Sequence, residues 1–419
     1  SDLYKCPIWK INHHYAHALS SWMLESKKPD IHFVFDGVGD DQIWTIFKDD
    51  KMIEYMDIDH RCKGSIYDGS IGHFMTEIGK WLGVGLSIDR YGDLDTAGKV
   101  MGLQSYGQVD KNYLKILNEY DIHSLKQIFS IETWEKYKED PLLAKLSPLT
   151  YLRTVHQRIG DLLVDFFKKY ANENDIISYT GGVAQNVIWN TQLKKTFKNL
   201  IIPPHCGDEG LSLGGIEWLR IKNNLPKFKL ENFPYIQSDE SPMDEPTIET
   251  IQKVAQLLAD GKIIGWYQGH GEIGPRALGN RSLLMDARII DGKNKMNMIK
   301  RRENYRPFGA SVLQEDAKEH FELDFDDKYM LYCAKVKSDK FPAITHVDGT
   351  CRVQTVDDEN KLFKSLLLEF KKITGSSVVM NTSLNLAGKP IAGYIENAKE
   401  LFSTSQLDCL VYGNTIILK

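Results

Sequence analysis

Residues 176–222 decide the fold class; they read IISYTGGVAQNVIWNTQLKKTFKNLIIPPHCGDEGLSLGGIEWLRIK. In order, the stretch predicts a strand, a glycine loop, a helix, a strand, a loop and a helix, at residues 176–179, 181–182, 184–198, 200–202, 203–210 and 211–222. Strands that alternate with helices are typical of α/β proteins. We therefore predict an α/β fold.

The chain before this stretch predicts elements of the same kind. We expect a helix over residues 13–26 and a long helix over 148–170, where apolar residues recur every three or four positions. Residues 31–35 and 43–47 read as strands, joined by the turn 36–41, which is rich in glycine and aspartate. These elements belong to one α/β domain with the deciding stretch.

A boundary between two domains is predicted near residues 226–246, because Pro226, Pro234, Pro242 and Pro246 fall there among polar residues. The predicted domains are residues 1–235 and 245–419. In the second domain we expect helices and strands in mixed order: helices at 247–259, 292–303, 361–373 and 396–405, and strands at 263–267, 376–380, 409–412 and 415–418.

Composition excludes several classes of protein. The chain has 419 residues, a net charge of −5 and 42% hydrophobic residues, which argues against a disordered chain and a strongly basic nucleic-acid coat. It has neither an apolar run of bilayer length nor the apolar core of a signal peptide at its start. Its six cysteines form no CxxC pair, which favours reduced thiols. We therefore expect a cytoplasmic protein without a membrane segment.

Residues 13–17 read His-His-Tyr-Ala-His. On a helix, His13 and His17 lie on one face and can bind one metal ion, while His14 points elsewhere. A zinc protease of the His-Glu-x-x-His type would need Glu at position 14, so a metalloprotease is disfavoured. Three surface histidines near a terminus are the alternative interpretation.

Two acidic residues can complete such a metal site. Asp36 ends a predicted strand, and Asp208 lies in the loop 203–210 before a helix. Two imidazoles and two carboxylates, with positions left for ligand oxygens, suit Fe²⁺, Mn²⁺ or Zn²⁺. Taken singly, Asp36 also reads as a turn residue and Asp208 as a helix N-cap.

Two glycine pairs, Gly181-Gly182 and Gly214-Gly215, each accompany a strand–helix unit. Glycine loops at such places let the backbone approach a phosphate or a nucleotide. Close packing of helices is the alternative explanation for these glycines.

The strongest motif is residues 269–282, GHGEIGPRALGNRS, which follow a predicted strand directly. Backbone N–H groups and the guanidinium groups of Arg276 and Arg281 suit a small dianion. Further polar and basic candidates for the same site are Lys300, Arg302, Arg306, His346, Arg352, Asn381 and Ser383. A charge run usually forms a solvated face, but residues 306–310 lead into an apolar strand, which favours a site.

These motifs resemble those of the ATP-dependent O-carbamoyltransferase family, which includes nodulation-factor and antibiotic-tailoring enzymes. The matching N-terminal motifs are His13-His14-x-x-His17-Ala18, Asp36-Gly37, Gly181-Gly182-Val183-Ala184-x-Asn186 and Gly207-Asp208. The C-terminal motifs are Gly274-Pro275-Arg276-Ala277-Leu278-Gly279-Asn280-Arg281-Ser282, Lys300-x-Arg302-Glu303-x-x-Arg306-Pro307-Phe308, His346-x-Asp348-Gly349-x-x-Arg352-x-Gln354 and Asn381-Thr382-Ser383-x-Asn385.

The resemblance implies a fold for each domain. Residues 1–235 would form part of an actin/hexokinase-like (ASKHA) domain similar to tRNA threonylcarbamoyl transferases, and residues 245–419 a YrdC-like domain. Family members begin with a strand and a phosphate-binding hairpin upstream of the histidines, where this chain starts. We therefore expect either a truncated product or a second polypeptide, or a homodimer, that supplies the N-terminal part.

The resemblance also implies the chemistry. The C-terminal domain would form carbamoyl adenylate from carbamoyl phosphate and ATP, and the N-terminal domain would transfer the carbamoyl group to a hydroxyl of a small molecule, sugar or nucleoside. The implied cofactors are a divalent metal ion, Fe²⁺ ahead of Mn²⁺ or Zn²⁺, and Mg²⁺ with ATP. Carbamoyl or threonylcarbamoyl transfer to a protein or tRNA, and a non-catalytic subunit, are the alternatives.

Each predicted site residue has a role on this interpretation. Metal ligands are His13, His17, Asp36 and Asp208; catalytic residues are His14 and Arg276; nucleotide-binding residues are Gly181, Gly182, Asn186, Gly207 and Gly214. Carbamoyl phosphate and ATP would be bound by Arg276, Arg281, Lys300, Arg302, Arg306, His346, Arg352, Asn381 and Ser383.

Overall fold

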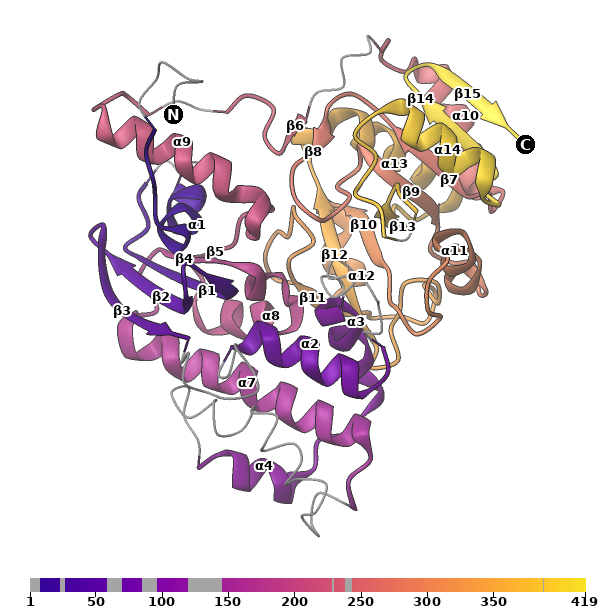
Figure 1. Cartoon of the computed structure of the whole chain (residues 1–419). Coiled ribbons are helices and arrows are strands. Elements are labelled where there is room, and N and C mark those ends of the chain that lie inside the picture. Colours follow the sequence, from indigo (N-terminus) through magenta and orange to yellow (C-terminus); the bar gives the residue numbers. More distant parts are fainter. Residues whose placement is uncertain are drawn as a thin grey trace.

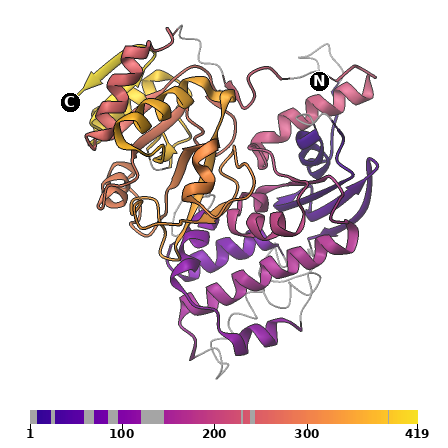
Figure 2. The same ribbon diagram turned by 180° about the vertical axis from the view of Figure 1, so that it is seen from behind.

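The chain folds into two lobes, seen side by side in Figure 1 and from behind in Figure 2. The structure is a computed structural model, and it describes residues 8–22, 27–58, 70–84, 96–119, 145–227, 230–237, 243–386 and 388–419. We call the described residues up to 227 the first lobe and those from 243 onwards the second lobe. Each lobe is built on a sheet of its own, with helices against it.

The first lobe contains a sheet in the order β3-β2-β1-β4-β5 within the described ranges. Its strands are β1 (Ile31–Gly39), β2 (Gln42–Lys48), β3 (Lys51–Asp57), β4 (Ile177–Thr180) and β5 (Leu200–Ile201). The first three pair antiparallel, and β4 and β5 continue parallel to β1.

Helices cover this sheet: α1 (His13–Trp22), α2 (Ile71–Trp81), α3 (Thr96–Leu103), α4 (Lys111–Leu117), α7 (Pro148–Tyr170), α8 (Val187–Thr196) and α9 (Leu211–Lys222). The long helix α7 begins as predicted, because the Ser147 side chain accepts the N–H of Thr150 and Pro148 occupies the first turn. Its apolar face, with Val155, Ile159 and other residues, lies in the core against β1.

The second lobe contains a sheet in the order β11-β12-β10-β13-β9-β7-β14-β15 within the described part of the chain. Its strands are β7 (Ile264–Tyr267), β9 (Arg281–Asp286), β10 (Gly309–Leu313), β11 (Cys333–Lys335), β12 (Thr350–Val356), β13 (Val379–Ser383), β14 (Cys409–Tyr412) and β15 (Thr415–Leu418). The accompanying helices are α10 (Ile248–Ala259), α11 (Gly292–Lys300), α12 (Ala317–His320), α13 (Lys361–Thr374) and α14 (Ile395–Thr404). Both lobes are mixed α/β, which confirms the predicted fold class.

Several predicted elements differ in their bounds. The helix predicted at 184–198 is a 3₁₀ turn, Gly182–Gln185, followed by α8, because the Asn186 side chain caps α8 by accepting two backbone N–H groups. The strand predicted at 376–380 is shifted to Val379–Ser383. The helix predicted at 13–26 ends at Trp22, and residues 23–26 lie outside the described ranges.

The segment predicted as a linker contains a strand, β6 (Tyr235–Gln237). It pairs antiparallel with β8 (Gly271–Glu272), so this part of the segment belongs structurally to the second lobe. The lobes also interlock elsewhere, since Leu331 and Tyr332 of the second lobe are buried in the core cluster of the first. Among the described residues there is no helix with the length and apolarity needed to cross a bilayer.

Candidate functional site

Four predicted metal ligands converge at the start of α1. Among the described residues, potential ligand atoms of His13, His17, Asp36 and Asp208 all lie within 4.8 Å of one another. The Nε2 atoms of His13 and His17 are 3.1 Å apart, and His17 Nε2 lies 3.3 Å from Asp208 Oδ1. Ligand atoms placed tetrahedrally at about 2.0–2.1 Å from an ion are about 3.4 Å apart. The four residues therefore fit one divalent ion.

Local structure explains this convergence. The i, i+4 spacing on α1 brings the two histidines to one face, as predicted. Asp36 lies within β1, beyond its predicted end, and its Oδ1 accepts the N–H of Gly182 at 3.0 Å. Gly39 lets the chain pass His13 closely, because a Cβ there would lie 2.2 Å from the imidazole.

The charges of the cluster balance internally. Asp208 and Asp36 raise the pKa of His13 to about 10. Burial alone would lower the pKa of His17, but hydrogen bonds to the same carboxylates raise it. The histidines in turn hold the pKa of Asp208 well below its ordinary value. In the metal-free protein, protons on the imidazoles thus take the place of a cation. This is expected of imidazoles and carboxylates that are arranged to bind a metal ion.

The cluster has one open side. The His17 side chain is fully buried, whereas the Asp208 side chain is 71% exposed. A ligand can therefore reach an ion on the side of Asp208 without displacing the core.

His14 has a different environment from its two neighbours. It is fully buried, and its Nδ1 lies 2.8 Å from Thr45 Oγ1 on β2. Burial lowers its pKa to about 4, so the imidazole is neutral at physiological pH. In this structure His14 fixes α1 against the sheet, and its catalytic role stays a prediction.

The glycine pairs turn out to serve different purposes. Gly181 has a φ of 93°, and a Cβ there would lie 2.1 Å from the Phe35 carbonyl oxygen, so this turn requires glycine. Gly214 lies inside α9, which corrects the predicted loop at Gly214-Gly215. A Cβ on Gly214 would lie 1.9 Å from the Ala16 carbonyl oxygen, so this glycine allows α9 to pack closely on α1.

Two further predicted nucleotide-binding residues are Gly207 and Asn186. Gly207 precedes Asp208, and its N–H donates to Glu209 Oε1 at 3.2 Å. The Asn186 side chain is taken up by its cap of α8 and by a contact with His156 at 3.0 Å. Nucleotide binding by these residues stays a prediction.

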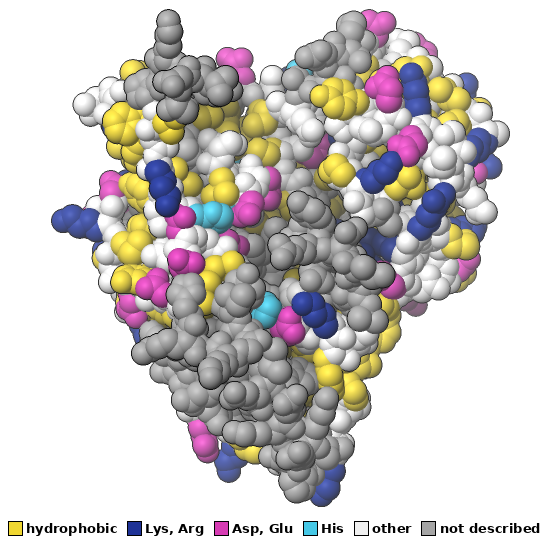
Figure 3. All heavy atoms as spheres, viewed as in Figure 1, with side chains coloured by type: hydrophobic (Ala, Val, Ile, Leu, Met, Phe, Trp, Pro, Cys, Tyr) yellow, Lys and Arg dark blue, Asp and Glu magenta, His cyan; other side chains and the backbone are white. Residues whose placement is uncertain are grey.

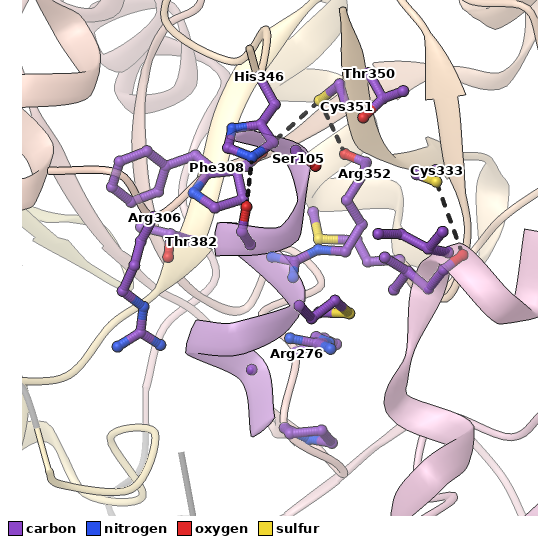
Figure 4. Close-up of a pocket in the computed structure, with 18 of the residues that line it drawn as sticks. Ser105, Arg276, Arg306, Phe308, Cys333, His346, Thr350, Cys351, Arg352 and Thr382 are labelled. Carbon is purple, nitrogen blue, oxygen red and sulfur yellow. Dashed lines mark hydrogen bonds between the residues drawn. The ribbon is translucent and has the colours of Figure 1, made fainter. Parts of the chain in front are cut away.

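A second site is a pocket of about 200 Å³ between the lobes, shown in Figure 4. Six of the predicted carbamoyl phosphate residues line it: Arg276, Arg302, Arg306, His346, Arg352 and Ser383. They come from separate loops and strands of the second lobe. The lining also includes Gly98, Met101, Gly102 and Ser105 from the α3 region, and Val187 and Ile188 from α8. The first lobe thus closes the pocket.

The arginines of the pocket retain donor atoms for an anion. Nε of Arg276 and Nε of Arg352 are buried and have no hydrogen-bond partner among the described residues. Burial lowers the pKa of both guanidinium groups, and it does so strongly for Arg352, which also lies near Arg276. Two desolvated cations this close favour an anionic ligand between them.

The remaining arginines are held by neighbours. Arg302 Nε donates to Asn297 Oδ1 at 2.8 Å, and its guanidinium lies 4.1 Å from the centre of the Phe308 ring. Arg306 pairs with Glu303 at 3.7 Å. Outside the pocket, Lys and Arg side chains are spread singly over the visible face of the second lobe (Figure 3). On this face the Lys and Arg side chains form no cluster like that of the four arginines in the pocket.

Three predicted residues do not line this pocket. Arg281 is fully buried, and its guanidinium donates to backbone carbonyl oxygens. Lys300 donates to Ser383 O at 2.7 Å, and burial lowers its pKa well below the ordinary value. Asn381 Nδ2 donates to Ser311 Oγ at 2.9 Å in the core. In this structure these side chains organise the walls rather than face the cavity.

The α3 region was missed by sequence reasoning, although it covers the pocket. His346 Nε2 donates to the Gly102 carbonyl oxygen at 2.9 Å, and Ser105 Oγ donates to Asp348 Oδ2 at 2.8 Å. Gly102 allows this approach, because a Cβ there would lie 3.1 Å from Pro307 Cδ. Glycines at positions 98 and 102, one helical turn apart, were the available signal.

One short turn joins the two sites. In the turn Gly182–Gln185, the Gly182 N–H donates to the predicted metal ligand Asp36 at 3.0 Å. The Gln185 carbonyl oxygen accepts from Arg276 Nη2 at 3.2 Å. The histidine cluster and the arginine pocket are therefore neighbours across the seam between the lobes.

Comparison with known proteins agrees with this layout. Residues 2–216 match the family model described as Carbamoyltransferase N-terminus, and residues 255–419 match Carbamoyltransferase C-terminus. The chain is 30% identical over 95% of its length to an uncharacterized protein of Methanocaldococcus jannaschii and 30% identical over 98% to nodulation protein NolNO of Sinorhizobium fredii.

A third relative has a more specific name. The chain is 30% identical, over 62% of its length, to a 3'-hydroxymethylcephem-O-carbamoyltransferase of Streptomyces clavuligerus. The matches span 72%, 64% and 52% of the lengths of these three relatives, in the order given. The two family models together cover both lobes, and the chain therefore belongs to the carbamoyltransferase family.

Proposed function

We propose that the chain uses carbamoyl phosphate and ATP to carbamoylate a hydroxyl group. The arginine pocket between the lobes is the observation that carries this proposal, because a cavity with Arg276, Arg302, Arg306 and Arg352 in its walls suits a small phosphorylated donor. A hydroxyl acceptor is supported by the cephem O-carbamoyltransferase among the relatives. Family membership supports the carbamoyl group as the one transferred.

In the proposed first half-reaction, carbamoyl phosphate, ATP and one water yield carbamoyl adenylate, phosphate and pyrophosphate. The guanidinium groups bind phosphate oxygens and neutralise the charge that develops as pyrophosphate leaves. Cys351 has its pKa raised to about 12 by burial, and burial also raises the pKa of Cys333. Both pocket cysteines are therefore neutral thiols, and the proposal gives them no nucleophilic role.

In the proposed second half-reaction, the acceptor oxygen bonds to the carbamoyl carbon and AMP leaves. His13, His17, Asp36 and Asp208 would hold a divalent ion, Fe²⁺ ahead of Mn²⁺ or Zn²⁺. Such an ion supplies polarisation of the carbonyl and stabilisation of the leaving adenylate. Asp208 lies at the exposed side, where an acceptor can approach.

Two measurements test the proposal. Carbamoyl phosphate should be required for exchange of labelled pyrophosphate into ATP, with Mg²⁺ present. Mass spectrometry across a panel of sugars, nucleosides and hydroxymethyl compounds should then detect a product heavier by one carbamoyl group. Absence of exchange in folded, metal-loaded protein would overturn the proposed donor chemistry, whereas exchange without product would restrict the error to the acceptor.

A further inference from the structure

A buried glutamate lies behind the loop that carries Arg276. Glu272, on β8, is 2% exposed and forms no part of the pocket lining. Among the described residues, its Oε1 accepts three backbone N–H groups of the loop: those of Leu278, Asn280 and Arg281. The carboxylate thus binds the far end of the loop, whereas Pro275, Arg276 and Ala277 of the same loop line the cavity.

The fully buried Arg281 donates hydrogen bonds, whereas Glu272 accepts them. Its guanidinium stacks 3.6 Å from the centre of the Tyr267 ring. It donates to backbone carbonyl oxygens on both sides of the loop, those of Gln268, Gly269, Asn280 and Ala392. Glu272 satisfies N–H groups of the loop, and Arg281 satisfies carbonyl groups around it.

Other side chains complete the set of backbone partners. The Leu278 carbonyl oxygen accepts from the Tyr235 hydroxyl at 3.0 Å and from Gln354 Nε2 at 2.8 Å. The Gly279 carbonyl oxygen accepts from Trp266 Nε1 at 2.9 Å. Side chains therefore hold most of the backbone groups of residues 278–280, together with one backbone hydrogen bond from Gln268 N–H to the Asn280 carbonyl oxygen, and these side chains lie outside the pocket lining.

A buried charge is costly unless it is well hydrogen-bonded, so the free-energy cost of burying Glu272 must be offset by another effect. Burial raises the pKa of Glu272 above its ordinary value, against the opposing effect of the N–H donors and Arg281. The offsetting effect is the positioning of Arg276. Because the backbone of residues 278–281 is held in place, the backbone at Arg276 is fixed as well, and from there its guanidinium reaches the Gln185 carbonyl oxygen across the seam.

We propose that Glu272 is a positioning residue that fixes the backbone of the 273–281 loop and thereby aims Arg276 at the carbamoyl phosphate. This inference rests on the proposed function of the pocket. Arg281 has a structural role in holding the same loop.

The test begins with three single variants of the full chain. Glu272→Gln keeps the shape and one acceptor oxygen but removes the charge. Tyr235→Phe removes only the hydroxyl that donates to Leu278. This milder variant keeps the test possible if Glu272→Gln does not fold. Glu217→Gln is the matched control, because Glu217 is also a buried glutamate, 1% exposed, but pairs with Arg220 within α9, away from the pocket.

We expect the KM for carbamoyl phosphate in pyrophosphate exchange to rise about tenfold in Glu272→Gln and about threefold in Tyr235→Phe. Glu217→Gln should leave that KM unchanged even if its melting temperature falls. In the double variant Glu272→Gln/Arg276→Lys, the loss should equal that of Arg276→Lys alone, because the glutamate acts through the arginine.

Each result decides the question. Additive losses in the double variant, or an unchanged KM in folded Glu272→Gln and Tyr235→Phe, would overturn the positioning role. If wild-type protein shows no carbamoyl phosphate-dependent exchange, the proposed function fails instead, and direct titration with inorganic phosphate then tests whether Glu272→Gln weakens anion binding by the same factor.

Discussion

The histidine cluster and the arginine pocket differ in how they treat charge. In the cluster, each imidazole lies within 3.8 Å of both carboxylates, so positive and negative groups balance. In the pocket, Arg276 and Arg352 are desolvated close to one another, and each retains a buried Nε without a partner in the described structure. The first arrangement suits a bound cation and the second a bound anion, so the two neighbouring sites at one seam suit ligands of opposite charge.

The largest expected effect comes from removing a ligand of the cluster. His17→Ala should lower metal affinity and carbamoyl transfer by roughly three decades, because a three-ligand site with a cavity replaces a four-ligand site. Metal content by mass spectrometry and product formation measure the two effects. His320→Ala, in the second lobe, is the control. Full metal occupancy in folded His17→Ala protein would show that the cluster is not the metal site.

The second prediction concerns pH and the cluster alone. The pKa of His13 is raised to about 10 in the metal-free protein, so its proton must leave when a metal ion binds. Below that pKa, each proton released makes the apparent metal affinity rise about tenfold per pH unit. Titrations between pH 6 and 8 should therefore show affinity that increases with pH. A flat profile would show that binding does not displace these protons.

The third prediction concerns the pocket alone. Arg276→Lys should lower kcat/KM for carbamoyl phosphate by about one to two decades, because Lys keeps the charge but cannot form a planar, bidentate contact. Steady-state exchange kinetics with varied carbamoyl phosphate measure this. Arg288→Lys, on an arginine paired with Asp286 outside the pocket, is the matched control. Equal kinetics in both variants would remove Arg276 from the donor site.

A smaller effect should follow from disturbing the cluster indirectly. Gly214→Ala places a methyl group against the Ala16 carbonyl, which should cost about 1–3 kcal/mol of stability and shift α1 with its histidines. We expect a few-fold weaker metal binding and unchanged pyrophosphate exchange. Gly215→Ala is the control, because a Cβ there meets no atom within 4 Å. Equal melting temperatures for the two variants would contradict the close packing of α9 on α1.

The cluster was predictable from sequence because its geometry is largely local. The i, i+4 spacing of His13 and His17 survives any arrangement of the rest of the chain. Asp36 could be paired with them because it follows an apolar strand, although the structure extends β1 past it. The helix and strand periodicity that gave α7, α13, β14 and β15 also required no knowledge of distant contacts.

The pocket was only partly predictable because its walls depend on the packing of the two lobes. Sequence cannot show that Arg281 and Lys300 point into the walls, since a buried and a ligand-binding cation look alike in a motif. The helices α2 and α3 and the strand β3 were missed altogether. Gly214 shows a related ambiguity, because a glycine pair can mark a phosphate loop or a helix contact, and here it marks the contact.

Carbamoyl phosphate-dependent exchange of pyrophosphate into ATP, measured side by side in His13→Ala and Arg276→Lys proteins, tests the central claim most directly. If the pocket activates and the cluster transfers, His13→Ala should retain exchange within about threefold while losing carbamoyl transfer, and Arg276→Lys should lose most of its exchange. Loss of exchange in folded His13→Ala protein, with exchange retained in Arg276→Lys, would contradict the division of labour between the two sites.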